Sequence, residues 1–525
     1  MSLLTPPPTR SAGSLRDRFG GGRERWAPLL GLSVLASIGL VIITLVVFWA
    51  LWAVANTDYD VWGGVVVGPL LLLATYPIAR HLSRTERDPW LVTIIMVALV
   101  LKLLASIVRY VMTFEVYGSG DAMVYIREGL IYAEQVRQGD LSYEITTGGG
   151  VGTHFIRRIT GYVFAVIGAT GIGGFFVFSW FGFLGMCLFF RAFRLAVPHG
   201  EARRYAVLLF LLPTLLYWPS SIGKEAWMLL TLGLGAYGAA RVLVHRPGGY
   251  SLFIVGLLGS AAVRPHMTAL LAVAFALSFL LRRSPNGSMF GLVAKVVGAV
   301  IVVGATVWAI GAAEERFEVE GEGLAGAEQV IDRTAEQTSK GGSEFDAARP
   351  TSPLDVPGAV FTVMFRPLPH ETHNLQALAT SLEGVFLLGL FALSWPRLRR
   401  LPKEMLRSPY VVFACTYSLM FMLAFSSFGN FGILARQRAQ LFPLILIILA
   451  LPAIKDVSTR RSRRGGRTLV PEHAPAPPSS SAAEDGAGIE GAVDPVRAPV
   501  PVPHRRGAEL VIDLPQGVTR SDAEN

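Results

Sequence analysis

Residues Trp90–Met112, WLVTIIMVALVLKLLASIVRYVM, form a long apolar run in which Lys102 and Arg109 are the only charged residues. A helix needs about 20 mostly apolar residues to cross the roughly 30 Å hydrocarbon core of a bilayer. This run meets that length, whereas the buried helices of soluble proteins rarely stay apolar on all sides for so long. We therefore predict a transmembrane helix here.

Comparable apolar runs recur along the chain. Of its 525 residues, 52% are hydrophobic and only 16% are charged, and the mean hydropathy is +0.48. Soluble chains average about 25% charged residues, so this composition excludes a soluble multidomain enzyme. The two cysteines, Cys187 and Cys415, both lie inside apolar runs, which excludes a disulfide scaffold and redox chemistry. The expected fold class is an all-α polytopic transmembrane bundle.

The apolar runs predict about twelve transmembrane helices with both termini in the cytoplasm. The expected spans are 27–55, 61–79, 90–112, 159–190, 206–220, 223–245, 250–263, 267–281, 288–312, 376–395, 410–427 and 438–454. The net charge of +9 is concentrated in short basic stretches that all fall on one side of this arrangement, at 16–25, 80–87, 191–204, 282–283, 397–403 and 460–467. By the positive-inside rule that side is cytoplasmic, which predicts a multi-pass plasma-membrane protein.

Three regions follow from this topology: a basic N-terminus (1–26), the bundle (27–454) and a tail rich in Pro, Ala and Ser (455–525) that is expected to be disordered. The bundle carries two external loops, 113–158 and 313–375. The second loop is acidic up to about residue 355 and then apolar. The short spans 250–263 and 267–281 are expected to form a broken or re-entrant pair.

The first external loop carries a candidate catalytic carboxylate. Asp121, Tyr125, Glu128 and Tyr132 recur at helical spacing, which predicts an amphipathic external helix with this polar face towards the protein. An aspartate at the water boundary can act as a general base. The alternative is an interfacial helix without chemistry.

Several cationic side chains are predicted at the same membrane level, where ionisable groups are costly and usually functional. Lys224 and Glu225 open a returning helix after Pro219, and a helix N-terminus suits a phosphate. Glu225 could equally complement the helix dipole while Lys224 snorkels. Arg264 and His266 lie at the break in VRPHM (263–267). Arg264 requires an anionic partner, either Glu225 or Asp121 or, as we favour, a substrate phosphate.

Two further segments supply polar candidates. The segment MFRPLPHETHNLQ (364–376) contains Arg366, His370, Glu371 and His373, which we expect to bind sugar hydroxyls or phosphate rather than a metal ion. Before the last span, Arg436 and Arg438 diverge by about 200° if they lie on a helix. We assign phosphate binding to that pair without choosing between them. Arg109 could join the site, whereas Lys102 and Lys295 are expected to snorkel or pair.

Four motifs carry a resemblance to known families. GDAMVYIREGLIYAEQVRQGDLSYE (120–144) resembles the first external loop of GT-C-type membrane glycosyltransferases, which use polyprenyl-phosphate sugars. YWPSSIGKEA (217–226), VRPHM (263–267) and FGILARQRAQLFP (431–443) look like segments of O-antigen-type polymerases of bacterial surface polysaccharides. The first resemblance implies that Asp121 is the catalytic base. The second implies that cations hold a lipid-diphosphate donor, namely Lys224, Arg264, Arg436 and Arg438.

The expected function is transfer of a sugar from a polyprenyl-(di)phosphate donor to a lipid or glycan acceptor of the cell envelope, at the external membrane face. The substrate pocket would contain Tyr125, Glu128, Glu225, His266, Arg366, His370, Glu371 and His373. No cofactor or metal site is expected, although a divalent cation is compatible with the chemistry, and no nucleic-acid partner is expected. The alternatives are a polymerase that joins lipid-diphosphate oligosaccharides without an aspartate base, a transporter or flippase of an anionic lipid or solute, and a membrane scaffold.

Overall fold

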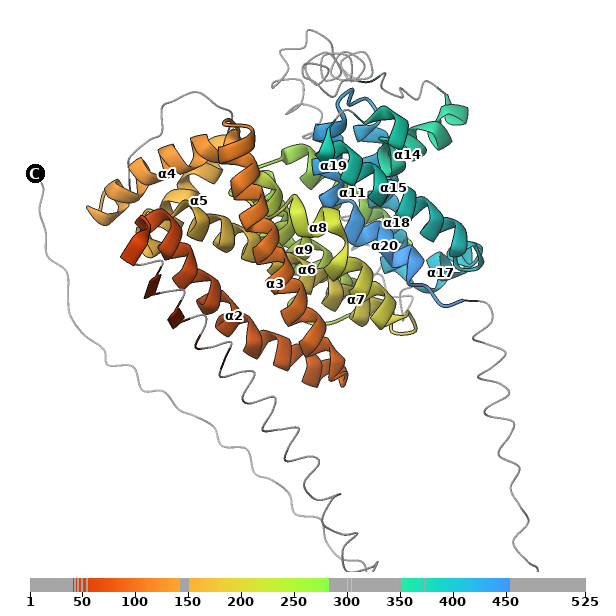
Figure 1. Cartoon of the computed structure of the whole chain (residues 1–525). Helices are drawn as coiled ribbons and strands as arrows, with labels where there is room; N and C mark the ends of the chain where they lie inside the picture. Colours follow the sequence, from red (N-terminus) through yellow and green to blue (C-terminus); the bar gives the residue numbers. More distant parts are fainter. Residues whose placement is uncertain are drawn as a thin grey trace, which may run out of the picture. The chain divides into compact units, whose positions relative to one another are not determined.

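The computed structural model describes residues 55–141, 151–282, 352–372 and 374–453, and the single residues 41, 44, 47, 48, 51, 52, 300, 304 and 345. All of them belong to one compact unit, Met1–Arg464. The regular structure in these ranges is helical and includes no β-strand (Figure 1), which confirms the predicted all-α class. The proposed N-terminal region 1–26 and tail 455–525 lie outside the described residues.

Five described helices are long and apolar enough to cross a membrane, which is consistent with a membrane protein. They are α2 (Tyr59–Glu86), α3 (Trp90–Val111, extended by η1, Met112–Val116), α6 (Gly171–Ala196), α9 (Lys224–Leu243) and α15 (Leu375–Leu393). A sixth span results if α19 (Phe431–Gln437) and η4 (Arg438–Gln440) are joined to α20 (Phe442–Leu449) across a 68° bend. The total of about twelve stays a prediction, since expected spans 27–55 and 288–312 lie almost entirely outside the described residues.

The remaining described helices are shorter. They are α4 (Asp121–Arg137), α5 (Val151–Ile167), α7 (Ala202–Leu211), α8 (Pro213–Tyr217), α10 (Gly249–Ala261), α11 (Pro265–Leu280), η2 (Pro353–Asp355), α14 (Val356–Phe365), η3 (Pro369–Glu371), α16 (Trp395–Leu398), α17 (Leu401–Arg407) and α18 (Pro409–Phe425). The predicted interruption between 250–263 and 267–281 is confirmed, because α10 ends at Ala261 and α11 begins at Pro265.

The predicted single span 159–190 is wrong, because the chain breaks between α5 and α6. Gly168 has a φ of +85°, a conformation that glycine adopts without steric cost. Thr170 then caps α6, and its Oγ1 accepts a hydrogen bond from the Gly173 N–H at 3.0 Å. The residues around this turn are apolar, so hydropathy alone did not reveal it. The break lets α5 pack along α4 instead of continuing into α6.

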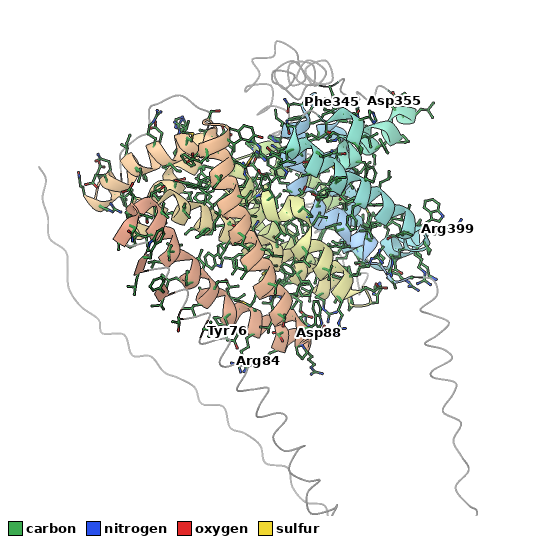
Figure 2. The ribbon with its side chains drawn as sticks, in the orientation of Figure 1. Tyr76, Arg84, Asp88, Phe345, Asp355 and Arg399 are labelled. Atoms are coloured by element: carbon green, nitrogen blue, oxygen red, sulfur yellow. The ribbon has the colours of Figure 1, made fainter. Side chains whose placement is uncertain are left out.

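Three of the predicted cytoplasmic stretches, 80–87, 191–204 and 397–403, meet at one end of the described bundle. Arg194 pairs with Glu86 at 2.8 Å and Arg397 with Glu201 at 2.6 Å, and Nε2 of His199 lies 2.6 Å from a carboxylate oxygen of Glu404. Figure 2 shows Arg84 and Asp88 far from Phe345 and Asp355, which lie on the opposite side. The sequence-based assignment of this basic end to the cytoplasm is a prediction.

Close helix packing fixes the position of α9. A Cβ on Gly185 of α6 would lie 2.2 Å from the carbonyl oxygen of Leu229, and a Cβ on Gly238 would lie 2.4 Å from the backbone nitrogen of Phe253 in α10. Small residues allow helix backbones to approach this closely in membranes. Helix α9 is therefore held between α6 and α10, and its N-terminus, which carries Lys224 and Glu225, has a fixed place.

Lys102 lies in the middle of α3 and has no solvent exposure. Its Nζ donates a hydrogen bond to the carbonyl oxygen of Leu215 at 2.8 Å. In a continuing helix that oxygen would accept from residue 219, but Pro219 has no N–H. Lys102 therefore supplies the donor that the proline lacks. Of the two alternatives expected for Lys102, snorkelling or pairing, its burial and this hydrogen bond exclude snorkelling, and Lys295 lies outside the described residues.

Candidate functional site

A cavity of about 260 Å³ lies where four segments distant in the sequence meet, namely 109–125, 221–225, 263–266 and Arg436. Its lining includes four cations and two carboxylates, so its formal charge is +2: Arg109, Lys224, Arg264, Arg436, Asp121 and Glu225. Tyr125 and His266 also line it, together with Thr113, Tyr117, Ser119, Gly120, Ala122, Ser221, Ile222, Gly223 and Val263. Seven of the thirteen predicted site residues therefore share one cavity: Asp121, Tyr125, Lys224, Glu225, Arg264, His266 and Arg436.

The cavity and the basic end lie at opposite ends of α3. Trp90 starts this helix, and the Arg203 guanidinium lies over its ring at the basic end, 5.6 Å from the ring centroid. Arg109 lies near the other end of α3 and lines the cavity. At a rise of 1.5 Å per residue the two positions are separated by about 28 Å, close to the thickness of a hydrocarbon core.

Asp121 is the first residue of α4, where the chain turns after η1. Gly118, with a φ of +59°, makes that turn possible. The Asp121 side chain is 67% exposed, and its Oδ2 lies 3.5 Å from Nη1 of Arg436. The carboxylate thus stands at the open side of the cavity, in reach of both water and a cation.

Helix α4 confirms the predicted amphipathic helix. Tyr125, Glu128 and Tyr132 are buried, as expected for a polar face turned towards the protein. Burial raises the pKa of Tyr125 to about 12, and the negative charges of Asp121 and Glu225 add to this effect. The Tyr125 hydroxyl is therefore protonated at neutral pH. Glu128 does not line the cavity, and its carboxylate lies 3.1 Å from Arg127.

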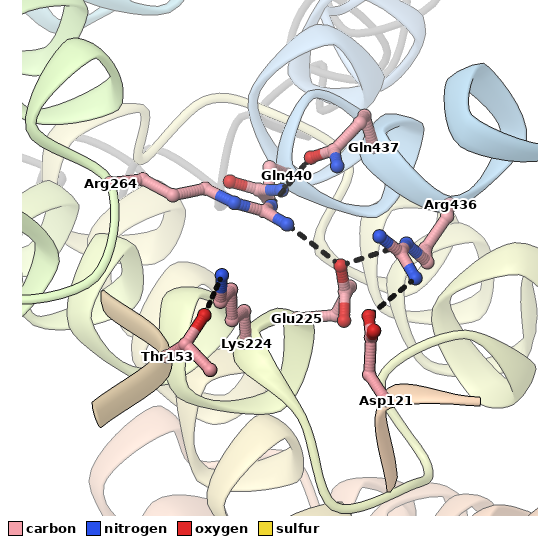
Figure 3. Close-up of polar contacts among 8 residues, drawn as sticks. All are labelled: Asp121, Thr153, Lys224, Glu225, Arg264, Arg436, Gln437 and Gln440. Atoms are coloured by element: carbon pink, nitrogen blue, oxygen red, sulfur yellow. Dashed lines mark hydrogen bonds and ion pairs between the residues drawn. The ribbon is translucent and has the colours of Figure 1, made fainter. Parts of the chain in front are cut away.

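Glu225 is the centre of the charge network (Figure 3). Its Oε1 lies 2.8 Å from Nη2 of Arg264 and 3.1 Å from Nε of Arg436, although its side chain is only 8% exposed. Lys224, the first residue of α9, donates from Nζ to Thr153 Oγ1 at 3.0 Å. The residues before it, 221–223, also line the cavity, so the amide-rich start of α9 is part of its wall.

Arg264 reaches the cavity because α10 and α11 are interrupted. It occupies the N-cap position of α11, followed by Pro265, and its side chain is 9% exposed. Nη1 donates to Oε1 of Gln437 at 2.5 Å, and Gln440 donates to the same oxygen at 2.6 Å. Of the two carboxylates that the sequence left open as partners, Glu225 is the one that pairs with Arg264.

Arg109 also lines the cavity, although sequence analysis identified it only as a possible member of the site. Its guanidinium carbon lies 5.1 Å from the ring centroids of both Tyr217 and Trp218, which is cation–π geometry. Its Nε is buried and has no hydrogen-bond partner in the described part of the chain. No carboxylate of that part lies within ion-pair distance of it. One feature of the sequence indicated that Arg109 could belong to the site. It lies seven residues after Lys102, near the end of α3 that leads into the first predicted external loop.

Arg438 turns away from this cavity. It is 2% exposed, and its guanidinium donates to the carbonyl oxygens of Val363 at 2.5 Å, Thr362 at 3.4 Å and Arg366. The predicted divergence of Arg436 and Arg438 is therefore seen, since both lie in consecutive helical turns. Arg436 therefore lines the cavity, whereas Arg438 binds backbone carbonyl oxygens at the end of α14.

The described segment 366–372 does not line the cavity either. Arg366 pairs with Glu371 at 2.5 Å and lies over the rings of Phe345 and Phe431. Burial alone would raise the pKa of Glu371, but hydrogen bonds from Arg366 and from the Leu368 N–H lower it below its ordinary value. His370 is exposed, and His373 lies outside the described residues. Within the described ranges no three His, Cys, Asp or Glu side chains form a group that could hold a metal ion.

A second cavity of about 180 Å³ adjoins the first, and the sequence did not predict it. Tyr117 lines both cavities.

No protein-family model, curated protein or solved structure matches this chain.

Proposed function

We propose that the protein is an integral-membrane glycosyltransferase that transfers a sugar from a polyprenyl-(di)phosphate donor to an acceptor at the external membrane face. The observation that supports this proposal is the gathering of Arg109, Lys224, Arg264 and Arg436 around one cavity. Cations are costly at membrane depth, and the two carboxylates in the lining neutralise only half of them. Such a cavity favours an anionic ligand.

In the proposed reaction the acceptor hydroxyl attacks the anomeric carbon of the donor sugar. The bond between that carbon and the phosphate oxygen breaks, the acceptor proton passes to Asp121, and the lipid phosphate leaves with the bonding electrons. Arg264, Arg436 and Lys224 stabilise the charge that develops on the leaving phosphate. The start of α9 adds backbone donors on the same wall. No cofactor is required.

The dimensions of the cavity support a lipid headgroup as ligand. Small-molecule sites usually measure about 300–1,000 Å³, and this cavity, at about 260 Å³, lies just below that range. A phosphate with part of a sugar fits this space, whereas a whole oligosaccharide must extend beyond it. Asp121 stands at the exposed side, where an acceptor arriving from water would meet the donor.

A polymerase of lipid-diphosphate oligosaccharides is the second candidate, and one observation favours it. Asp121 already has a cationic partner, Arg436, at 3.5 Å. A carboxylate held in this way can orient the arginine instead of accepting a proton. In a polymerase the same cations would hold the diphosphate donor, and no aspartate base would be needed.

Binding of polyprenyl phosphate to the full-length protein in detergent tests the anion site. We expect Arg264→Gln to weaken binding at least tenfold, because charge-assisted hydrogen bonds contribute about 1.5–3 kcal/mol each. The matched control is Arg399→Gln, which changes an exposed arginine in the predicted cytoplasmic loops. Equal affinity in the wild type and in Arg264→Gln would overturn the proposal, as would an equal loss in the control.

A further inference from the structure

The second cavity lies directly beside the cationic one. Tyr117 lines both, and Arg109 of the first cavity stacks on Trp218 of the second at 5.1 Å. The second cavity is lined by Tyr117, Trp218, Pro367, Asn374, Gln376, Ala377, Thr380, Phe431, Gly432 and Ala435. A ligand bound through its phosphate in the first cavity can therefore extend into the second.

The two linings differ in chemistry. The second cavity has no charged side chain in its lining. It combines three aromatic side chains, Tyr117, Trp218 and Phe431, with the amides of Asn374 and Gln376. Aromatic faces pack against the C–H faces of sugar rings, and a few placed polar groups fix orientation in such pockets. An uncharged ring that carries hydroxyl groups matches this lining better than an anion or an acyl chain.

The protein's own hydrogen bonds engage the side-chain oxygens of Asn374 and Gln376, so their NH₂ groups can donate to a ligand. Asn374 Oδ1 accepts from the Ala377 N–H at 2.8 Å, which caps α15. Gln376 Oε1 accepts from the Tyr117 hydroxyl at 2.7 Å. Both amide oxygens are thus engaged, whereas neither NH₂ group has a hydrogen-bond partner among the described residues. These groups can donate only to acceptors such as hydroxyl oxygens.

We propose that the second cavity binds the ring of a neutral sugar next to the phosphate held by the first cavity. This inference rests on the proposed function, because the first cavity must take the phosphate. The ring can belong to the donor, linked directly to that phosphate, or to the acceptor glycan. Either source presents the same hydroxyl chemistry, and the experiment separates them.

The experiment compares dissociation constants of the full-length protein for three kinds of probe. They are polyprenyl phosphate, polyprenyl phosphates carrying glucose, mannose, galactose or arabinose, and soluble neutral trisaccharides of the same sugars. The variant Gln376→Met keeps the side-chain length but removes the amide. Asn374→Asp keeps the oxygen that caps α15 but removes the NH₂ donor. The matched control is Leu382→Met, an exposed position on the same helix.

For at least one sugar, we expect the wild type to bind the glycosylated lipid more tightly than the bare lipid. Gln376→Met should remove about tenfold of that difference and change affinity for the bare lipid by less than twofold. A loss confined to the soluble trisaccharides assigns the cavity to the acceptor.

Two results would overturn the inference, and they differ in what they leave standing. Suppose that Arg264→Gln weakens binding of the bare lipid, but neither Gln376→Met nor Asn374→Asp changes affinity for any glycosylated probe. The second cavity is then not a sugar site, and the proposed function stands. If the bare lipid does not bind through Arg264, both proposals fail together.

Discussion

Glu225 and Arg264 form a buried ion pair at 2.8 Å although they are 39 residues apart in the chain. The pair joins the start of α9 to the break between α10 and α11. Arg264 uses Nη1 and Nη2 for Gln437 and Glu225, and a guanidinium carries five N–H donors. It can therefore hold Glu225 and still donate to a phosphate.

Glu225→Gln should destabilise the protein, because it leaves Arg264 and Arg436 without their shared counter-charge. Breaking a buried pair in this way costs about 3–5 kcal/mol. Thermal unfolding in detergent measures the loss. An anion that binds the cavity should restore the missing charge, so polyprenyl phosphate should raise the Tm of Glu225→Gln more than that of the wild type. An equal rise in both proteins would contradict this reading of the cavity.

Asp121→Asn separates the two enzymatic candidates. If Asp121 is the general base, the substitution should lower kcat by about 10²–10⁴-fold. Donor affinity should change little, because the side chain is exposed and at the margin of the charge network. Turnover and binding are measured on the same preparation. Retained turnover in Asp121→Asn, combined with its loss in Arg264→Gln, would favour the polymerase.

Arg436 and Arg438 should respond in opposite ways. Arg436→Ala should weaken polyprenyl-phosphate binding by about tenfold or more, since it removes a charged donor from the cavity. Arg438→Ala should instead lower stability, because each carbonyl left unsatisfied costs about 1–3 kcal/mol. Polyprenyl-phosphate binding and thermal unfolding are measured for both variants, so that each variant is the control for the other. Similar profiles for the two variants would contradict the division of roles.

The titration of Glu371 should make the stability of the protein depend weakly on pH below neutrality. Its pKa in the folded state lies below the ordinary value of 4.5. The Arg366–Glu371 pair therefore contributes stability above pH 4.5, and this contribution is lost as the pH falls through the lower folded-state pKa. We expect at most about 1 kcal/mol, because the pair is partly exposed. Thermal unfolding measured from about pH 3 to about pH 7 should show this loss of stability in the wild type but not in Glu371→Gln.

Gly185→Ala should disturb the packing that positions the start of α9. The added Cβ would overlap the carbonyl oxygen of Leu229, and overpacking of this kind costs about 1–3 kcal/mol. Gly389→Ala, on α15, is the matched control, because a Cβ there has nothing within 4 Å. Thermal unfolding of the two variants tests the difference. A Gly185→Ala protein as stable as the control would show that α6 and α9 have room to separate.

The sequence predicted the helical class and much of the cationic cavity for the same reason. Charges such as Arg264 and Lys224 are costly in an apolar chain, so they mark candidate site residues in the sequence. Helix geometry also separated Arg436 from Arg438 in direction. It could not say which of them faces the cavity, because that depends on the rotation of α19 against its neighbours.

The second cavity could not be predicted, because its lining comes from ordinary residues. Trp218, Gln376 and Phe431 attract no attention singly, and they meet only through tertiary packing. The turn at Gly168 was missed for a related reason, since an apolar run gives no sign of a single residue with positive φ. The ion pair between Arg366 and Glu371 could not be predicted either, because the sequence does not show that this segment brings the two side chains together.

The hydrogen bond from Lys102 to Leu215 spans 113 residues of chain. During biosynthesis α3 enters the bilayer before α8 has left the ribosome, so its central ammonium group must wait for the carbonyl oxygen that satisfies it. Until then this group opposes the insertion of a helix that is otherwise strongly apolar. The polar centre of α3 is therefore satisfied only once the segment that ends at Pro219 has been translated.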